Sequence, residues 1–375
     1  MKAKSIKGSS TAQLREQLQK TTADGFQPTL AIVFASVKMN LKEVVDLLQQ
    51  YDISVFGATS NGEFIDEDLG HGSAAILLMD MRKENFFIQF EELEQGSERQ
   101  VAEALGTAAR EIFSEPALLI ATSNLETDAE EVLEGLMQSI GENVSVFGAM
   151  AGDDLSMKEQ FVFTNGHISS RGIVTVVINA AAVDFKGKAT SGWKSLGTAK
   201  VITKCVGNQV YEIDGVPALD LCLKYSGLDE AADHLELEMA TSAPLQLQRE
   251  NGAAIMRPVY RINKKDRSLT VSGKLSQGAK VKFSLPPDFD TINTVITESQ
   301  NLKMETPDAE ALIMFNCAAR YLTFGDVISK EVEGVKNVWN VPMVGLFSSA
   351  ELARATDGNL EMHNLTTCYV ALKEK

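Results

Sequence analysis

The sequence predicts an α/β protein in which β-α-β units repeat in mixed sheets, with a hairpin-rich region before the last unit. Three observations support this prediction. A five-residue motif occurs twice in identical letters, β-prone and helical patterns alternate around each copy, and the texture of the chain changes between the second and third units. A repeat of this kind defines the architecture of the whole chain.

Each unit joins two short β-prone runs through a helical pattern. In the first unit the runs are 30–34 and 53–58, and apolar residues from Leu41 to Leu48 recur at helical spacing between them. The second unit uses runs 117–121 and 144–149 around a helix with its apolar stripe from Val132 to Ile140. The third unit has runs 311–315 and 341–347, and Ile328, Val332 and Val335 mark its helix.

The copies share residues as well as their plan. The stretch 54–58, Ser-Val-Phe-Gly-Ala, recurs at 145–149, and 343–346 is a looser third version. In each copy the glycine is followed six positions later by an acid; the pairs are Gly57 and Glu63, Gly148 and Asp154, and Gly345 and Glu351. Ligands of open α/β sheets bind beyond the carboxyl ends of the strands. We therefore expect the glycines at strand ends and the three acids facing one accessible space.

The middle of the chain has a different pattern of predicted secondary structure. Residues 189–285 contain short β-prone runs separated by turn pairs such as Asp214-Gly215 and Asn251-Gly252, which are typical of hairpins. One helix is expected there, with Pro217 near its start and Gly227 at its end. We place a domain boundary near residue 186, so that 1–27 forms an N-terminal extension, 28–186 holds two repeats, and 187–375 holds the hairpin-rich region with the third repeat.

Composition excludes several classes of partner. Lys and Arg total 35 against 51 Asp and Glu, which gives a net charge of −16. Such a surface repels phosphate backbones and anionic lipids, so neither nucleic acid nor a membrane is an expected partner. The chain has no apolar stretch of the length that membrane insertion needs and no secretory pattern, which predicts a cytoplasmic location. The four cysteines and four histidines show no metal-ligand spacing, and no cofactor or metal is expected.

Several stretches resemble the FIST-domain family. They are Val-Phe-Gly-Ala-Thr-Ser-Asn-Gly-Glu at 55–63, Phe-Gly-Ala-Met-Ala-Gly-Asp at 147–153, Met-Phe-Asn-Cys-Ala-Ala-Arg at 314–320 and Gly-Leu-Phe-Ser-Ser-Ala-Glu at 345–351. The resemblance implies an N-terminal and a C-terminal FIST domain in a sensory protein of intracellular signal transduction. It also implies a small polar ligand, such as an amino acid or another small carboxylate, and a separate partner: a histidine kinase, chemoreceptor or cyclase acting in trans.

The candidate ligand-binding residues lie at the predicted strand ends or in the matching stretches. They are Asn61, Glu63, Trp193, Cys317, Arg320, Ser348 and Glu351. Arginine offers a two-bond fork to a carboxylate, and we expect Arg320 with Glu351 to form the charged part of the pocket. Asn61 supplies a hydrogen bond and Trp193 an accessible aromatic wall.

Structural roles compete with each of these assignments. Acids at strand ends also cap turns, an arginine also forms an internal ion pair, and Cys317 reads more simply as a buried thiol than as a nucleophile. We expect a binding protein without enzymatic activity. The rival interpretations are a hydrolase or transferase that uses Cys317 or Ser191, and an adaptor that binds a protein surface without any small ligand.

Overall fold

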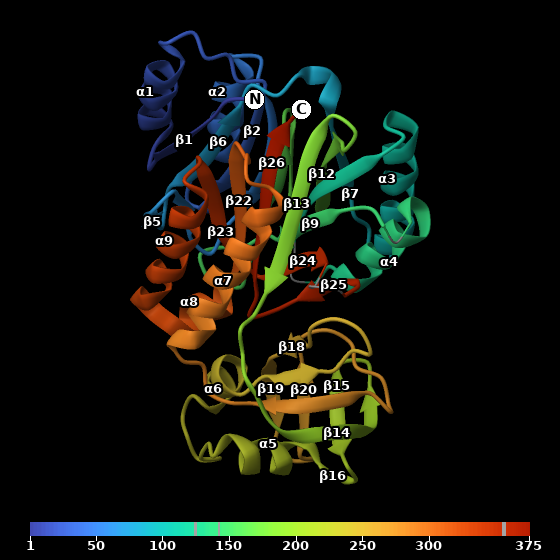
Figure 1. Ribbon diagram of the computed structural model, residues 1–375. Coiled ribbons are helices and arrows are strands. Elements are labelled where there is room, and N and C mark those ends of the chain that lie inside the picture. Colours follow the sequence, from blue (N-terminus) through green and yellow to red (C-terminus); the bar gives the residue numbers. More distant parts are fainter. Residues whose placement is uncertain (124–125, 142, 355–357) are drawn as a thin grey trace.

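Three β-α-β units form the body of the molecule (Figure 1). The chain is seen in a computed structural model that describes residues 1–123, 126–141, 143–354 and 358–375. The units are β2 (Leu30–Ala35), α2 (Leu41–Gln49) and β3 (Ser54–Thr59); β8 (Pro116–Thr122), α4 (Ala129–Ile140) and β9 (Val146–Met150); and β22 (Ala311–Cys317), α8 (Ala318–Phe324), α9 (Ile328–Trp339) and β23 (Met343–Ser348). The two strands of each unit pair in parallel. The predicted repeat and the α/β class are confirmed.

Antiparallel strands extend each parallel pair in the same way. The last strand of each repeat lies beside the first strand of its unit; these last strands are β6 (Ala74–Met79), β12 (Gly172–Asn179) and β26 (Thr367–Glu374). An outer strand then covers each of them; the outer strands are β1 (Ala3–Gly8), β7 (Phe86–Glu92) and β13 (Val183–Thr190). The three sheets therefore have the same strand order. The repeat seen in the sequence thus extends to most of the body.

The hairpin that follows each unit crosses to a neighbouring sheet. The hairpins are β4 (Glu63–Ile65) with β5 (Asp68–Gly70), β10 (Val162–Thr164) with β11 (His167–Ser169), and β24 (Ala350–Arg354) with β25 (Leu360–His363). Strand β4 pairs with β23, β24 pairs with β9, and β10 pairs with β3. This exchange closes a ring of three sheets, so that no repeat completes its own sheet.

The repeated glycines make the exchange sterically possible. Gly57 lies opposite Phe163 and Gly345 lies opposite Phe64, both phenylalanines belonging to exchanged strands. A Cβ atom on Gly57 would lie 2.0 Å from the Phe163 ring, and one on Gly345 would lie 2.1 Å from the Phe64 ring. The expectation that these glycines lie at strand ends is therefore wrong, because they lie within β3 and β23 to admit a neighbour's side chain.

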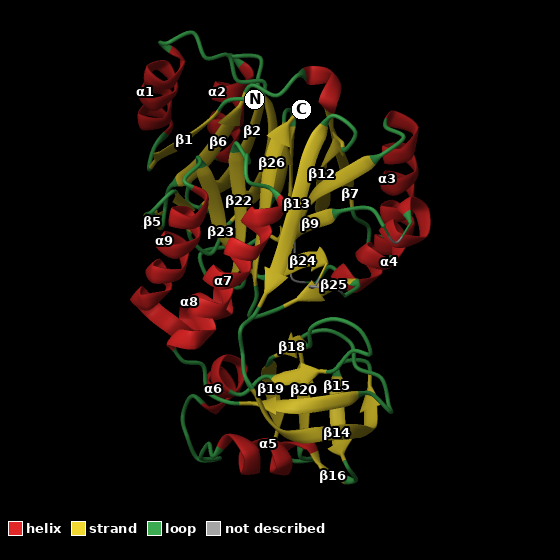
Figure 2. Cartoon of the chain, viewed as in Figure 1, coloured by secondary structure: helices red, strands yellow, loops and turns green. Residues whose placement is uncertain are grey.

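The three sheets enclose one apolar core and carry their helices outside (Figure 2). The inner faces contribute residues such as Phe34, Leu119 and Ile313. The outer faces are covered by α1 (Thr11–Thr22) with α2, by α3 (Glu98–Ile112) with α4, and by α7 (Phe289–Glu305) with α8 and α9. Near-continuous apolar strands follow from burial on both faces.

The hairpin-rich region is a separate small domain inserted between β13 and α7 (Figure 1). We call residues 191–285 the inserted domain. Its elements are β14 (Ser195–Val206), β15 (Gln209–Ile213), β16 (Val216–Pro217), α5 (Ala218–Ser226), α6 (Leu235–Ser242), β17 (Leu245–Leu247), β18 (Ile255–Arg257), β19 (Val259–Asn263), β20 (Ser268–Val271) and β21 (Lys280–Ser284). It has its own apolar core. The predicted helix is confirmed as α5, which follows Pro217 and ends at Gly227 with a φ of 70°.

Two predicted divisions of the chain differ from the structure. Residues 1–27, expected to form an extension, carry β1 and α1, and Leu14 and Leu18 of α1 are fully buried. Residue 186 lies within β13, which pairs with β26 along its whole length. The third repeat therefore begins with β13 and resumes at α7, after the inserted domain.

Candidate functional site

The loops that leave the three units interlock at the end of the body nearest the inserted domain (Figure 1). Asn61 joins them: its Oδ1 accepts from the backbone N–H groups of Asp153 and Leu155, each at 3.0 Å. Its backbone N–H donates to the Phe347 carbonyl at 2.9 Å, and its Nδ2 lies 3.5 Å from Ser349 Oγ. The three loops therefore lie in contact with one another, and hydrogen bonds of Asn61 connect them.

Glu63 is a fully buried acid at this place with both oxygens occupied. Its Oε2 accepts from Ser60 Oγ at 2.6 Å. Its Oε1 accepts from the Ser73 backbone N–H at 2.7 Å and from Ser73 Oγ at 2.6 Å. Burial raises the pKa of Glu63, and the serine hydrogen bonds act against that rise. The carboxyl group lies in a closed cage, not in the accessible space that the repeat suggested.

Glu351 is the equivalent acid of the third repeat, and its cage is incomplete. Ser348 Oγ donates to Oε1 at 2.7 Å and lies 3.2 Å from the Asn316 carbonyl oxygen. Oε2 is buried and forms no hydrogen bond of normal geometry among the described residues. Burial raises the pKa of Glu351 well above its usual range, against smaller opposing effects of Ser348, the Arg320 charge, the Thr366 N–H and the Cys317 thiol.

Asp154 shares the Gly-to-acid spacing but does not share this environment. It has a φ of 56° in the loop before β10, whereas Glu63 and Glu351 belong to exchanged strands. Ser36 Oγ donates to its Oδ2 at 2.8 Å, and Lys38 lies 3.1 Å from the same oxygen. The expected common space for three acids is therefore not formed.

Cys317 ends β22 beside Glu351 and is buried. Burial, together with the nearby Glu351, raises the pKa of this thiol to about 12. Its backbone N–H donates to the Thr366 carbonyl at 3.0 Å. At neutral pH the group is a protonated thiol, which is a poor nucleophile.

Arg320 begins the adjacent helix and forms a buried ion pair with Glu331. Both side chains have no solvent exposure. The guanidinium donates to both oxygens of Glu331, to the Ser191 carbonyl at 2.5 Å and to the Leu365 carbonyl at 3.1 Å. Asn316 Nδ2 also donates to Glu331, at 2.9 Å. The fork that we expected to meet a ligand's carboxylate is thus occupied by Glu331.

Trp193 covers this ion pair from the connection into the inserted domain. The Arg320 guanidinium lies 5.1 Å from the centre of the Trp193 ring, and the Phe324 ring meets Trp193 edge-on at 5.8 Å. Trp193 is 6% exposed and packs with Met256 and Leu365. The ring is therefore not an accessible wall; it joins the inserted domain to the body.

Unpartnered polar atoms concentrate around these two groups. Of the nine buried side-chain atoms without a hydrogen-bond partner in the described part of the chain, four lie here: Trp193 Nε1, Asn316 Oδ1, Glu351 Oε2 and Asn364 Oδ1. Each belongs to, or lies next in sequence to, a residue bonded within the Arg320 or Glu351 group. A buried polar atom without a partner costs about 1–3 kcal/mol, so a group of such atoms calls for a partner, such as a bound molecule, that satisfies them.

Three residues of this cluster, Glu331, Asn316 and Asn364, were not predicted from the sequence. The available signal for Glu331 was its place three residues after Ile328, on the helix face that also carries Val332 and Val335. An acid on an apolar stripe requires a buried partner.

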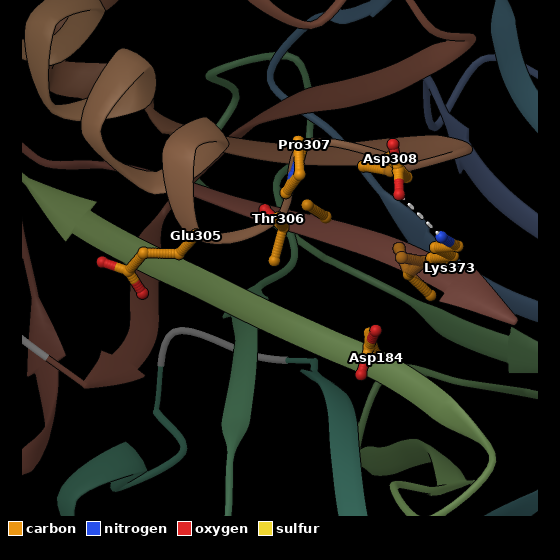
Figure 3. A pocket seen from close by; sticks show the side chains of 9 residues that line it. Asp184, Glu305, Thr306, Pro307, Asp308 and Lys373 are labelled. Atoms are coloured by element: carbon orange, nitrogen blue, oxygen red, sulfur yellow. Dashed lines mark hydrogen bonds and ion pairs between the residues drawn. The ribbon is translucent and has the colours of Figure 1, made fainter. Parts of the chain in front are cut away.

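A shallow hollow of about 70 Å³ lies away from this cluster, where α7 ends beside β13 and β26 (Figure 3). Thr306 and Pro307 line it, and Asp308 forms an ion pair with Lys373 at 3.0 Å across it. None of the predicted site residues lines this hollow. Its small volume fits no more than a few water molecules.

Comparison with known families identifies the chain. Residues 29–216 match the FIST N domain and residues 218–354 match the FIST C domain. The chain therefore belongs to the FIST-domain family, which is associated with sensory signal transduction. The junction between the two matches falls inside the inserted domain, next to α5.

No curated protein matches the chain. Among the described residues, no helix combines the length and apolar character that crossing a membrane requires.

Proposed function

We propose that the chain is a sensor that binds a small polar ligand between the body and the inserted domain, at the Arg320 and Glu351 groups. The observation that carries the proposal is the set of four unpartnered buried atoms at this junction. A ligand that bonds to them removes their desolvation cost, and this gain stabilises the bound state. The inserted domain then reports binding because Trp193 connects it to the site.

The unpartnered set matches a zwitterion or a small carboxylate. Burial favours the protonated form of Glu351, in which Oε2–H is a donor, as is Trp193 Nε1–H. Asn316 Oδ1 and Asn364 Oδ1 are acceptors. Two donors suit a carboxylate and two acceptors suit an ammonium group, which supports an amino acid as the ligand.

We propose no enzymatic step. The Cys317 thiol is protonated at neutral pH, and Ser191 offers its backbone carbonyl to Arg320. A nucleophile needs a base within hydrogen-bond reach, and Glu351, the acid beside Cys317, raises the thiol pKa instead of lowering it. The proposed output is a signal to a separate cytoplasmic partner such as a histidine kinase, chemoreceptor or cyclase.

A thermal-shift screen tests the proposal. The purified protein is heated with each of a panel of amino acids, their decarboxylated amines and simple monocarboxylates. A specific zwitterion or carboxylate at 100 times its Kd should raise Tm by a few degrees, because binding adds about 2.7 kcal/mol. The adaptor alternative predicts no shift with any compound.

A further inference from the structure

Two chain segments connect the inserted domain to the body. The chain enters it after β13 and leaves it before α7. Lys194 joins these two crossings through ion pairs with Asp288 at 3.0 Å and Asp290 at 2.7 Å. Gly192 between them has a φ of 80°, and a Cβ there would lie 2.5 Å from the Thr291 carbonyl oxygen. Two adjacent chain connections between a domain and the body can act as a hinge, because only a few residues need to change conformation.

Ion pairs fasten the domain at a second place, on α4 and β25. Arg257 bonds to Glu130 at 2.9 Å and to the Met362 carbonyl at 3.0 Å. Arg249 forms a two-bond pair with Glu361. Lys274 lies 2.7 Å from Asp128 and 2.8 Å from Glu131. In every one of these pairs the cation belongs to the inserted domain and the acid to the body.

The net charges of the inserted domain and the body are also opposite in sign. Residues 191–285 hold 13 Lys and Arg against 10 Asp and Glu, whereas the whole chain has a net charge of −16. The inserted domain is therefore slightly basic on a strongly acidic body. Attraction of this kind weakens with salt, because partly exposed pairs are screened.

The polar site touches both places: Arg320 bonds to the Ser191 carbonyl at the hinge, and Glu351 pairs with His363 of β25, the strand that carries Glu361. The site is closed to solvent. Glu351 has no exposure, Cys317 is 2% exposed and Trp193 is 6% exposed. Trp193 and Met256 of the inserted domain pack on Leu365 of the body, and Trp193 lies over Arg320, so the seated domain covers this side of the site. We propose that the inserted domain is a hinged gate over the ligand site, held shut by the Arg249, Arg257 and Lys274 ion pairs. This inference rests on the proposed function, since it describes how that site is opened.

The labelling rate of the Cys317 thiol measures opening of the gate, and no ligand is needed for this measurement. Its thiol is buried in the site, whereas Cys222 is 3% exposed inside the core of the inserted domain. Burial raises the pKa of both thiols to about 12, so both react slowly until exposed. Opening of the gate exposes Cys317 alone, and unfolding of the domain exposes Cys222. The probe is iodoacetamide at pH 8, with the labelled cysteine identified by peptide mass spectrometry.

Raising NaCl from about 25 mM to 500 mM should accelerate labelling of Cys317 about tenfold and leave Cys222 unchanged. The variant Arg249→Gln/Lys274→Gln should label Cys317 about tenfold faster already at low salt, with little further salt effect. Lys373→Gln is the matched control, because it removes one cation from an ion pair within the body. It should behave like the unmodified protein.

Two results would overturn the gate. One is a Cys317 labelling rate that changes neither with salt nor with the double substitution. The other is acceleration that Cys222 or the Lys373→Gln control shares, which indicates general unfolding. A thermal shift with a zwitterion in a protein whose Cys317 labelling ignores salt would remove the gate and leave the proposed function standing.

Discussion

Glu63 and Glu351 occupy equivalent positions in two repeats, yet only Glu351 keeps an oxygen without a hydrogen bond. Ser60 and Ser73 occupy both oxygens of Glu63, whereas Ser348 occupies one oxygen of Glu351. The inserted domain interrupts the third repeat, and Glu351 belongs to that repeat. The two repeats therefore provide an internal comparison: both oxygens of Glu63 are hydrogen-bonded, whereas Glu351 has one oxygen left for the proposed ligand.

The raised pKa of Glu351 predicts a stability that falls with rising pH. A buried acid with a raised folded-state pKa binds its proton more tightly in the folded protein than in the unfolded one. Stability is therefore lost as the pH rises above about 4.5. Glu351→Gln should flatten the dependence of the free energy of unfolding on pH between 5 and 8, as measured by urea denaturation. An unchanged slope in the variant would show that Glu351 is ionised in the folded state.

His363 predicts the opposite behaviour in acid. Burial, with smaller effects of Arg257 and Arg249, lowers its pKa to about 4, and its Nε2 lies 2.9 Å from the Ala353 carbonyl oxygen. Its contribution to stability is complete above about pH 6.5 and is lost as the pH falls toward 4, by on the order of 3 kcal/mol. His363→Gln should remove most of this loss in denaturation measured from pH 7 to 4. Identical acid sensitivity in the variant would assign the loss to other groups.

The exchange of strands predicts a specific steric coupling between Gly57 and Phe163. Gly57→Ala should lower the free energy of unfolding by about 1–3 kcal/mol, since the new methyl group overlaps the Phe163 ring. In combination with Phe163→Ala, most of this cost should vanish, although Phe163→Ala alone creates a cavity. Additive losses in the double variant would place the strain elsewhere in β3.

The Arg320 and Glu331 pair predicts strong non-additivity. Arg320→Met leaves a buried carboxylate without its cation and should cost about 3–5 kcal/mol. Glu331→Leu should cost a similar amount by leaving the guanidinium unpaired. The double variant should lose less than either single variant, as judged by chemical denaturation. Losses that simply add would mean that the two groups do not depend on each other.

Much of the body follows from the sequence because its signals are local. The repeated Ser-Val-Phe-Gly-Ala and the helical stripes depend on neighbours along the chain, and each predicted β-α-β unit is present. The pairing of β4 with β23 joins residues far apart in sequence. No local sequence pattern indicates that Phe64 pairs with Gly345. The pairing of Arg320 with Glu331 was missed for the same reason, since a buried ion pair is defined by packing.

Native mass spectrometry of the intact protein tests the central claim most directly. It is carried out with the compound that gives the largest thermal shift, on the unmodified protein, Glu351→Leu and Glu63→Gln. We expect one bound molecule per chain, affinity about tenfold weaker in Glu351→Leu because it removes the carboxyl donor, and unchanged affinity in Glu63→Gln. Equal binding by all three proteins, or a loss in Glu63→Gln alone, would contradict a ligand site at Glu351.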